Sequence, residues 1–361
     1  MTTNLRLRIE NPPPELDLTG YRVAIIGGAG FLGHHLVAAL ARRGAKVGVI
    51  DTLQAYNQLL FAPLETNAGD REFSRRAIDQ RLEVLNRAGV QLFVQDARDY
   101  HQLYSILDSE LNADVVVHLA TGGRVDRCGK DWLSTFDHSQ RTLENALDCS
   151  RGKNRHFIYL SSRVVYGDLG TAPVDEEAPL NPLSIHGVLK LSGEKMVVAY
   201  QQTFDLPYTI LRTSALYGPR QIGGRIGPVC IAAVPQGGEA TVDGSLEDVI
   251  DFTCVHDVVE GICLAVREPS ARNQVFNLSS GDPQKIGDFL AAHRRYFPTF
   301  QIKGGEADRL MPWAGTLNIS KATTLLGYTP QWDLRNGIAN YAAWYNEMKG
   351  LRPALHVLDA S

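Results

Sequence analysis

Two serines, a histidine and a lysine are the side chains of this 361-residue sequence best placed to do chemistry together. Ser161 and Ser162 follow the apolar run 157–160, which predicts a β-strand, and open α/β sheets bind ligands at the carboxyl ends of their strands. His186 and Lys190 stand four residues apart in a segment with helical periodicity, so both project from one face of a helix. A hydroxyl, an imidazole and an ammonium are therefore expected to converge at one site.

The segment GGAGFLG has the glycine spacing of a dinucleotide-binding loop, and it lies between an apolar run at 21–26 and a predicted helix that closes at Gly44. Small residues let the backbone approach a pyrophosphate, and the N-terminus of the helix supplies amide donors. The residues expected to contact the cofactor here are Gly27, Gly30, Phe31, Leu32 and Gly33.

Asp51 ends the strand that follows this helix. Its carboxylate would accept hydrogen bonds from the ribose hydroxyls of adenosine and would repel a 2′-phosphate, and no arginine follows it directly. The pattern therefore predicts NAD rather than NADP as the cofactor. The alternative is that Asp51 is a solvated acid in a loop.

Two later strand ends extend this predicted cofactor site. Asp96 and Ala97 follow a third strand and are expected near the adenine, although Asp96 could instead cap the helix that begins at Tyr100. The run 115–121 ends in small residues, as a dinucleotide lying across the strand would need. Its expected contacts are Leu119, Ala120 and Thr121. His118 in the same run is predicted to be a packed core residue rather than a ligand.

Strands and helices alternate along most of the chain, which predicts the α/β class with a Rossmann-type doubly wound parallel sheet. After Tyr217 a Gly/Arg loop and several short strands predict a smaller C-terminal α/β lobe that binds the substrate. The predicted parts are a disordered leader at 1–20, an NAD-binding domain at 21–215, a region at 216–345 that is mainly the substrate lobe with some segments returning to the sheet, and a tail at 346–361.

Composition narrows the range of partners. A net charge of -4 and a pI near 6.2 provide no basic field for nucleic acid. The five cysteines are scattered without CxxC spacing, which argues against a disulfide framework and a zinc site and fits a cytoplasmic protein. We expect no metal, and no apolar run resembles a signal peptide or a membrane span.

From about residue 21 to residue 340 the sequence resembles the extended short-chain dehydrogenase/reductase family, in particular its NAD-dependent epimerase/dehydratase group, best known for nucleotide sugars. The matching segments, in family order, are GGAGFLG, Asp51, QDARD, HLAT, SSRVVYGD, PVDEEAPLNPLS, HGVLKLSGEK, LRTSALYGPRQ, VHDVVEG and LNISKATTLLGY. The long segment after Asp51 is similar in placement to the one in uronic-acid 4-epimerases.

The resemblance implies catalytic roles for three residues. Ser162 matches the Ser/Thr that holds the reacting hydroxyl, and Lys190 matches the lysine that binds the nicotinamide ribose and lowers the pKa of the neighbouring acid. His186 stands where the family has the tyrosine of its YxxxK motif, the proton acceptor when NAD oxidises a sugar alcohol. Imidazole can do the same, because its pKa is about 6.5 against about 10 for a phenol and a nearby ammonium lowers it further. The alternative is that redox catalysis was lost with the tyrosine and that His186 is a packed or solvent-facing residue.

Two departures from the family concern the substrate. Ala215 replaces an asparagine that is usual in nucleotide-sugar enzymes, and Ile250 replaces an arginine that usually binds the diphosphate. The residues predicted to bind substrate are Ser161 and, as anion contacts from the C-terminal lobe, Arg220, Arg225 and Lys303. For each of these three cations the alternative is an ordinary solvated charge.

The predicted function is that of an NAD-dependent epimerase, dehydratase or dehydrogenase acting on a small molecule, a sugar or sugar-like polyol, by hydride transfer from a carbinol to tightly bound NAD. Two alternatives stay open. One is a non-redox isomerase or lyase in which NAD is structural, and the other is a non-catalytic NAD-binding protein. The resemblance and the long helices predicted at 132–149 and 186–204 also indicate a homodimer built on an intermolecular four-helix bundle. Its expected apolar residues are Val188, Leu191, Met196, Val197 and Val198.

Overall fold

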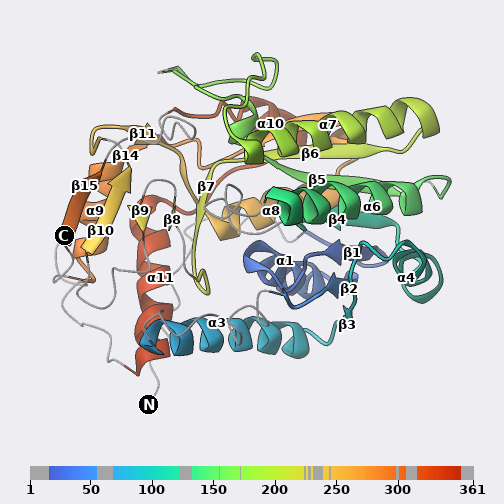
Figure 1. Cartoon of the computed structure of the whole chain (residues 1–361), viewed down its shortest axis with the longest axis horizontal. Helices are drawn as coiled ribbons and strands as arrows, with labels where there is room; N and C mark the ends of the chain where they lie inside the picture. The colour runs from blue at the N-terminus through green and yellow to red at the C-terminus, as the bar shows by residue number, and fades with distance from the viewer. Residues whose placement is uncertain are drawn as a thin grey trace.

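The computed structural model of the chain describes residues 16–54, 68–121, 132–153, 155–170, 172–222, 225–226, 229–230, 239–243, 245–297, 301–305 and 315–350. Seven parallel strands form its main sheet in the order β13-β6-β5-β4-β1-β2-β3 (Figure 1). They are β1 (Arg22–Ile26), β2 (Lys46–Asp51), β3 (Gln91–Val94), β4 (Val115–His118), β5 (His156–Ser162), β6 (Tyr208–Thr213) and β13 (Gln274–Leu278). Because the strand order reverses between β1 and β4, their carboxyl ends border the crevice in which doubly wound sheets bind ligands.

Helices cover both faces of this sheet, which confirms the predicted fold class. Apolar side chains of α1 (Phe31–Arg42), α8 (Val255–Arg267) and α10 (Ser320–Leu326) pack on one face. Those of α4 (Tyr100–Ser105) with its π-helical end η1 (Ile106–Glu110), α6 (Thr142–Ser150) and α7 (Ile185–Phe204) pack on the other. Strands buried between two helical layers need nearly continuous apolar sequences, and β4 is buried along its whole length.

The smaller lobe is built from short strands and two helices around a separate apolar core. Its sheets have the strand orders β15-β10-β9-β8, β11-β14 and β12-β7. The elements are β7 (Ala215–Tyr217), β8 (Arg225–Ile226), β9 (Val229–Cys230), β10 (Glu239–Asp243), β11 (Val249–Ile250), β12 (Phe252–Cys254), β14 (Gln284–Lys285), α9 (Ile286–Arg294), β15 (Gln301–Gly305) and α11 (Leu334–Lys349). The short helix η6 (Pro269–Ala271) follows α8 and packs in the core beneath the main sheet. Strand β13 and helix α8 lie with the main sheet, not with the lobe.

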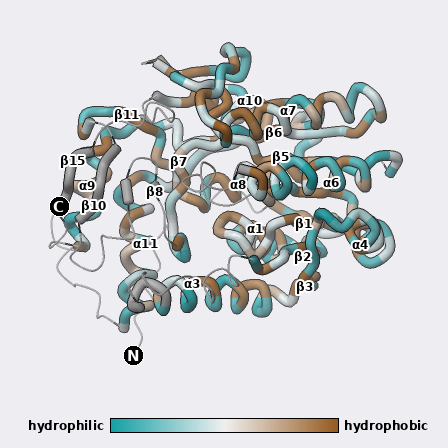
Figure 2. The backbone as a smooth tube through the Cα atoms, viewed as in Figure 1, coloured by the Kyte–Doolittle hydropathy of each residue, from teal (hydrophilic) through white to brown (hydrophobic). Residues whose placement is uncertain are grey.

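Helix α3 (Ala68–Arg87), from the predicted insertion, joins the two cores. Phe73 and Ala77 pack in the core of the lobe, whereas Leu85 packs in the core beneath the main sheet. The indole Nε1 of Trp344 in α11 donates a hydrogen bond of 2.7 Å to Gln80 of α3. Figure 1 shows α3 running from α11 toward β3, and Figure 2 shows hydrophilic and hydrophobic residues alternating along it, as a helix with one buried face requires.

The ends of the chain differ from prediction in two places. Residues 16–20 do not belong to a disordered leader, because Leu16 and Leu18 are buried in the core and the Leu18 amide donates to the Arg43 carbonyl at 2.8 Å. At the other end α11 continues past residue 345 to Lys349, and Met348 is buried in the lobe core. Both differences arise because apolar residues at these ends find cores that only the tertiary fold creates. The rest of the predicted leader and tail, 1–15 and 351–361, lies outside the described residues.

Local sequence explains the helices that border the predicted site. Ser184 caps α7 by accepting a hydrogen bond of 3.2 Å from the Gly187 amide, so the helix begins directly before His186. The predicted helix 132–149 consists of α5 (Trp132–Phe136), the π-helical turn η3 (Asp137–Arg141) and α6. A π-turn inserts one extra residue and re-aims the side chains that follow.

Candidate active site

The glycine-rich loop is shaped for close approach by a ligand. Gly27 has a φ of +87°, and a Cβ atom at this position would lie 2.9 Å from the Ala120 amide nitrogen. A Cβ atom on Gly33 would lie 2.6 Å from the Gly27 carbonyl oxygen. Helix α1 begins after Gly30 with no side-chain cap and no acidic residue in its first turn, so its first amides and its dipole are available to a phosphate. These features fit the pyrophosphate of a dinucleotide.

Asp51 is fixed beside this loop by the backbone. Its Oδ2 accepts a hydrogen bond from the Ala29 amide at 3.0 Å, and its Oδ1 accepts one from the Leu53 amide at 2.8 Å. Burial raises the pKa of the carboxyl, although these amides and the charge of Arg81 oppose the shift. Asp51 is thus not a freely solvated loop acid, and its contact with the ribose stays a prediction.

Asp96 and Ala97 follow strand β3, which pairs with β2. Strand β2 in turn pairs with β1, the strand that leads into the glycine-rich loop. The helix cap is Asp99, which accepts from the Gln102 amide, so the alternative of a cap at Asp96 is wrong. Burial would raise the pKa of Asp96, but hydrogen bonds and charge from Arg98, 2.6 Å away, hold it below its ordinary value. The carboxylate is therefore oriented and ionised, and its place near the adenine stays a prediction.

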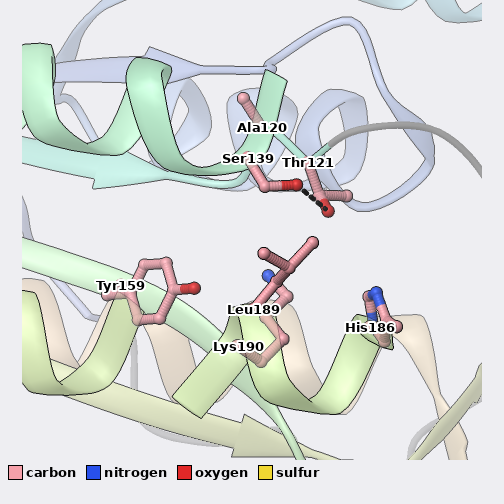
Figure 3. A pocket seen from close by; sticks show the side chains of 7 residues that line it. All are labelled: Ala120, Thr121, Ser139, Tyr159, His186, Leu189 and Lys190. Carbon is pink, nitrogen blue, oxygen red and sulfur yellow. Dashed lines mark hydrogen bonds between the residues drawn. The ribbon is translucent and has the colours of Figure 1, made fainter. Parts of the chain in front are cut away.

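A recess lies between the end of β4, β5 and α7 (Figure 3). It is lined by Ala120, Thr121, Ser139, Tyr159, His186, Leu189 and Lys190. Figure 3 shows Ala120, Thr121 and Ser139 on one side of the recess and the three residues of α7 on the other. The structure thus brings the predicted cofactor residues after β4 together with His186 and Lys190.

Lys190 and His186 are held in different ways. The Lys190 ammonium donates to the Leu160 carbonyl at 2.7 Å and lies 5.1 Å from the centre of the Tyr159 ring, and the side chain is only 8% exposed. His186 is half-buried at the start of α7. Burial, and then the nearby Lys190 ammonium, lower the pKa of His186 to about 4. At neutral pH this imidazole is therefore uncharged and able to accept a proton.

The two serines that end β5 have different surroundings. Ser162 caps the short helix η4 (Arg163–Val165), its Oγ accepting from the Val164 amide at 3.4 Å, and it is not among the residues that line the recess. Ser161 is 2% exposed and donates a hydrogen bond of 2.5 Å to Glu194. Successive strand residues point to opposite faces of a sheet, so the two hydroxyls could not share one site. Ser161 therefore links β5 to α7 inside the protein, and its prediction as a substrate contact is wrong.

Sequence reasoning missed the buried ion pair to which Ser161 is bound. Arg212 of β6 contacts both carboxylate oxygens of Glu194 in α7, at 3.0 and 2.7 Å, and both side chains are 4% exposed. Arg212 also donates to the Tyr166 hydroxyl at 2.8 Å. The pair secures α7 one turn beyond Lys190, and the only sequence signal was the four-residue step from Lys190 to Glu194.

Of the three cations predicted in the C-terminal lobe, Arg220 is the one whose side chain is described, and it does not line the recess. Arg220 turns toward α1, where its Nε donates to His34 Nε2 at 2.7 Å, because its backbone adopts a φ of +63°. Its prediction as a substrate contact is corrected accordingly. Arg225 lies in β8 and Lys303 in β15, and the side chains of both lie outside the described residues.

His118 is a core residue, as predicted. It is 1% exposed, and its Nε2 lies 3.3 Å from the Thr142 hydroxyl. Burial, and then the charge of Lys190, lower its pKa to about 3, so it is neutral. Its other ring nitrogen, Nδ1, finds no partner among the described residues.

Two residues of the recess were not predicted from the sequence. Tyr159 precedes Ser161 by two residues and so points to the same face of β5, a signal that alternation along the strand could have given. Ser139 lies in the π-turn η3, and its hydroxyl is 3.5 Å from that of Thr121. Helical periodicity does not place residues across a π-turn, so no sequence signal indicated Ser139.

Among the described residues, no three His, Cys, Asp or Glu side chains are grouped so as to hold a metal ion. No helix in the same part of the chain combines the length and hydrophobicity needed to cross a membrane.

Comparison with known proteins agrees with this architecture. Residues 23–279, more than half of the chain, match the model of the NAD dependent epimerase/dehydratase family. The uncharacterized UDP-glucose epimerase YtcB of Bacillus subtilis is 27% identical over 340 residues, which cover 91% of this chain and 98% of that protein. A dTDP-glucose 4,6-dehydratase of Actinoplanes is 28% identical over 338 residues, covering 90% and 97%.

A crystal structure of UDP-glucuronic acid 4-epimerase from Bacillus cereus, in complex with UDP-glucuronic acid and NAD, superposes with a TM-score of 0.77 at 25% identity. The match covers 90% of this chain and 99% of that one. The family model, the curated relatives and the shared fold agree with the glycine-rich loop and the fixed Asp51. The chain therefore belongs to the NAD dependent epimerase/dehydratase family, as an NAD-dependent enzyme of the extended short-chain dehydrogenase/reductase type.

Proposed function

We propose that the protein oxidises a hydroxyl-bearing carbon of a nucleotide sugar and that His186 accepts the hydroxyl proton. The observation that carries this proposal is the recess in which His186 and Lys190 face Ala120 and Thr121. A base, a cation and the small residues of the cofactor crevice thereby line one recess.

The residues of the cofactor site would hold NAD along the carboxyl ends of the strands. The first amides of α1 would bind the pyrophosphate, and Asp51 would bind the adenosine ribose. Bound NAD supplies the hydride acceptor for oxidation of the substrate. Lys190 would bind the nicotinamide ribose, because its ammonium is already fixed by the Leu160 carbonyl and the Tyr159 ring at the edge of the recess.

The proton moves to His186. As the carbon–hydrogen bond of the carbinol breaks, its hydroxyl becomes acidic, and a neutral imidazole within reach can take the proton. Burial and Lys190 keep His186 neutral, and the Lys190 charge also favours the developing alkoxide. Ser162, the last residue of β5, would orient the reacting hydroxyl from the carboxyl end of that strand, because its Oγ only accepts from the Val164 amide and keeps its own hydrogen to donate.

The substrate class is proposed from the relatives, whose names specify UDP-glucose, UDP-glucuronate and dTDP-glucose. This chain must bind a diphosphate differently from enzymes with an arginine at position 250, because Ile250 is fully buried in the core of the lobe. Ala215 is packed in the same core, so it offers the substrate no polar group.

The proposal is tested by incubating the purified protein with NAD and, separately, UDP-glucose, UDP-glucuronic acid and dTDP-glucose. Proton NMR of the sugar region reports epimerisation or dehydration, and NADH absorbance reports net oxidation. The proposal is supported if the wild-type protein forms product from any of the three nucleotide sugars and the His186→Phe variant forms none. Turnover that survives in His186→Phe would assign the chemistry to another residue, and no turnover of any of the three would reject the nucleotide-sugar class.

A further inference from the structure

A cluster of buried and half-buried basic side chains joins the cofactor loop to the C-terminal lobe, outside the recess. We call it the junction cluster; it consists of His34 and His35 of α1, Arg81 of α3, Arg220 of the loop 218–222 and His256 of α8. The rings of His34 and His35 lie 4.0 Å apart, and those of His35 and His256 lie 5.0 Å apart. Four different segments of the chain therefore meet at this point.

The hydrogen bonds of the cluster define the protonation of His34. Its Nδ1 lies 2.9 Å from the Gly30 carbonyl, which can only accept, so Nδ1 carries the hydrogen. Its Nε2 receives the hydrogen bond from Arg220 Nε at 2.7 Å, so Nε2 carries none. His34 is thus a neutral bridge between a carbonyl of the glycine-rich loop and a guanidinium of the lobe.

Arg220 is held in this bridge from both of its ends. Arg81 donates two hydrogen bonds to the Arg220 carbonyl, at 3.1 and 2.6 Å, and the left-handed backbone at Arg220 turns its side chain back toward α1. Gly218, two residues earlier, packs so closely that a Cβ atom would lie 2.6 Å from Val255 of α8. The loop 218–222 is therefore clamped, and it leads from β7 into the strands of the lobe.

We propose that His34 and Arg220 are positioning residues that couple occupation of the NAD site to the placement of the lobe. The Gly30 carbonyl accepts both the Nδ1 hydrogen and the backbone amide of His34, the latter at 3.2 Å. Gly30 is also the residue at which α1 begins and at which a pyrophosphate would bind. Any adjustment of this peptide when NAD binds is transmitted through one rigid ring to Arg220 and the loop of the lobe. The coupling goes beyond the proposed reaction and depends only on NAD binding.

Two substitutions at position 34 separate the ends of the bridge. In His34→Gln the amide oxygen reaches the place of Nε2 and can accept from Arg220, whereas in His34→Asn the shorter amide reaches only the place of Nδ1 and can donate to Gly30. Arg220→Met removes the guanidinium from the other side. His101→Asn, at an exposed histidine of α4, is the matched control.

Hydrogen–deuterium exchange measured with and without saturating NAD provides the readout. We expect NAD to slow exchange of the 216–222 and 334–349 amides by about tenfold in the wild type and in His101→Asn, a typical size for coupling between two sites. His34→Gln cuts the bridge at Gly30, and His34→Asn and Arg220→Met cut it at Arg220, so in all three the protection should be confined to the glycine-rich loop and its neighbours. If His34→Asn does not fold, Arg220→Met tests the same bridge.

Equal protection of the lobe in all variants would overturn the proposal, because the bridge would then transmit nothing. The same holds if NAD leaves the lobe unprotected in the wild type. Neither result depends on turnover of a sugar, so a failure of nucleotide-sugar conversion would reject the proposed function while leaving this test intact.

Discussion

At the scale of single residues, the proposed reaction depends most on His186. Replacing it with phenylalanine removes the proton acceptor while keeping a ring of similar shape, so the rate should fall by about 10² to 10⁴. His186→Tyr should restore part of the activity, because Lys190 is placed to lower the pKa of a phenol. Steady-state rates of His101→Phe, at an exposed histidine, provide the control.

The pH profile gives a second readout of the same residue. Because the pKa of His186 is lowered to about 4, the imidazole stays neutral as pH falls from neutrality and is protonated only near that value. The wild-type rate should therefore hold until about pH 5 and then fall. An activity in His186→Phe equal to that of the wild type, with an unchanged profile, would make the imidazole a bystander.

Asp51 is predicted to select the cofactor. In Asp51→Asn the side chain keeps its shape but loses the negative charge that repels a 2′-phosphate, so NAD should bind more weakly and the preference over NADP should shrink. Titration calorimetry of both proteins with both cofactors measures this. If the wild type binds NADP as tightly as NAD, the carboxylate does not discriminate between them.

Some of these residues could be predicted from the sequence because their geometry is local. The step from His186 to Lys190 is set by one helix, and the glycine spacing by one turn. Arg220 could not be placed, because its direction depends on a left-handed backbone and on a partner 186 residues away. The role of Ser161 could not be predicted, because its partner, the ion pair of Glu194 and Arg212, is assembled only in the folded protein.

At the scale of elements, the close contact of α7 with β5 sets the position of Lys190. A Cβ atom on Gly193 would lie 2.3 Å from the hydroxyl of Tyr159, whose ring supports the Lys190 ammonium. Gly193→Ala should therefore push α7 outward, lower the free energy of unfolding by about 1–3 kcal/mol and weaken NAD binding. Urea unfolding and calorimetry measure the two effects.

The neighbouring exchange Ser192→Ala is the control for this contact, because Ser192 is exposed on the outer side of the same helix. It should leave NAD affinity unchanged and should not lower stability. A fully stable Gly193→Ala protein with normal NAD affinity would show that α7 can shift without affecting the site.

The elements themselves were predictable to differing degrees. Helix α7 begins one residue before the predicted start and ends at the predicted Phe204. Ser184 caps its first turn, and Asp205, which adopts a left-handed backbone conformation, ends it. The division of the helix 132–149 by η3 was not predictable, because a π-turn is stabilised by what surrounds it. Gln140 in that turn donates to the Leu189 carbonyl of α7 at 2.8 Å, a contact formed only in the folded protein.

At the scale of the whole molecule, several buried histidines should make the protein sensitive to acid. Burial, the first cause in each case, lowers the pKa to about 3 for His118 and to about 4 for His156 and His293. In the unfolded chain each would titrate near about 6.5. Stability is therefore complete above that pH and is lost as pH falls from about 6.5 toward 4, since only the unfolded state takes up these protons readily.

Urea midpoints at about pH 7 and about pH 5 measure this loss. His293→Phe should reduce the difference between the two midpoints, because its Nε2 has no partner among the described residues and its ring already packs 4.5 Å from that of Phe289. Equal midpoints for the wild type at both pH values would contradict the expectation.

The homodimer stays a proposal, and the structure alters which residues would form it. Val197 is fully buried within its own subunit, so it cannot serve the predicted interface. Val188 and Ile185 of α7 are 52% and 49% exposed, and Phe136 of α5 is 52% exposed. We expect a dimer mass in light scattering at micromolar concentration and a monomer for Phe136→Glu combined with Val188→Glu. A monomeric wild type would reject the dimer.

The order of the seven strands has a consequence for how the chain is made. Strand β13 completes the edge of the main sheet beside β6, and α8 covers one of its faces, yet both are encoded after β7 to β12 of the lobe. A nascent chain that has emerged only as far as β6 presents an unpaired strand edge and an uncovered apolar face. The cofactor-binding half therefore cannot be completed before the lobe is synthesised, and the growing chain exposes this edge and this face until α8 and β13 have emerged.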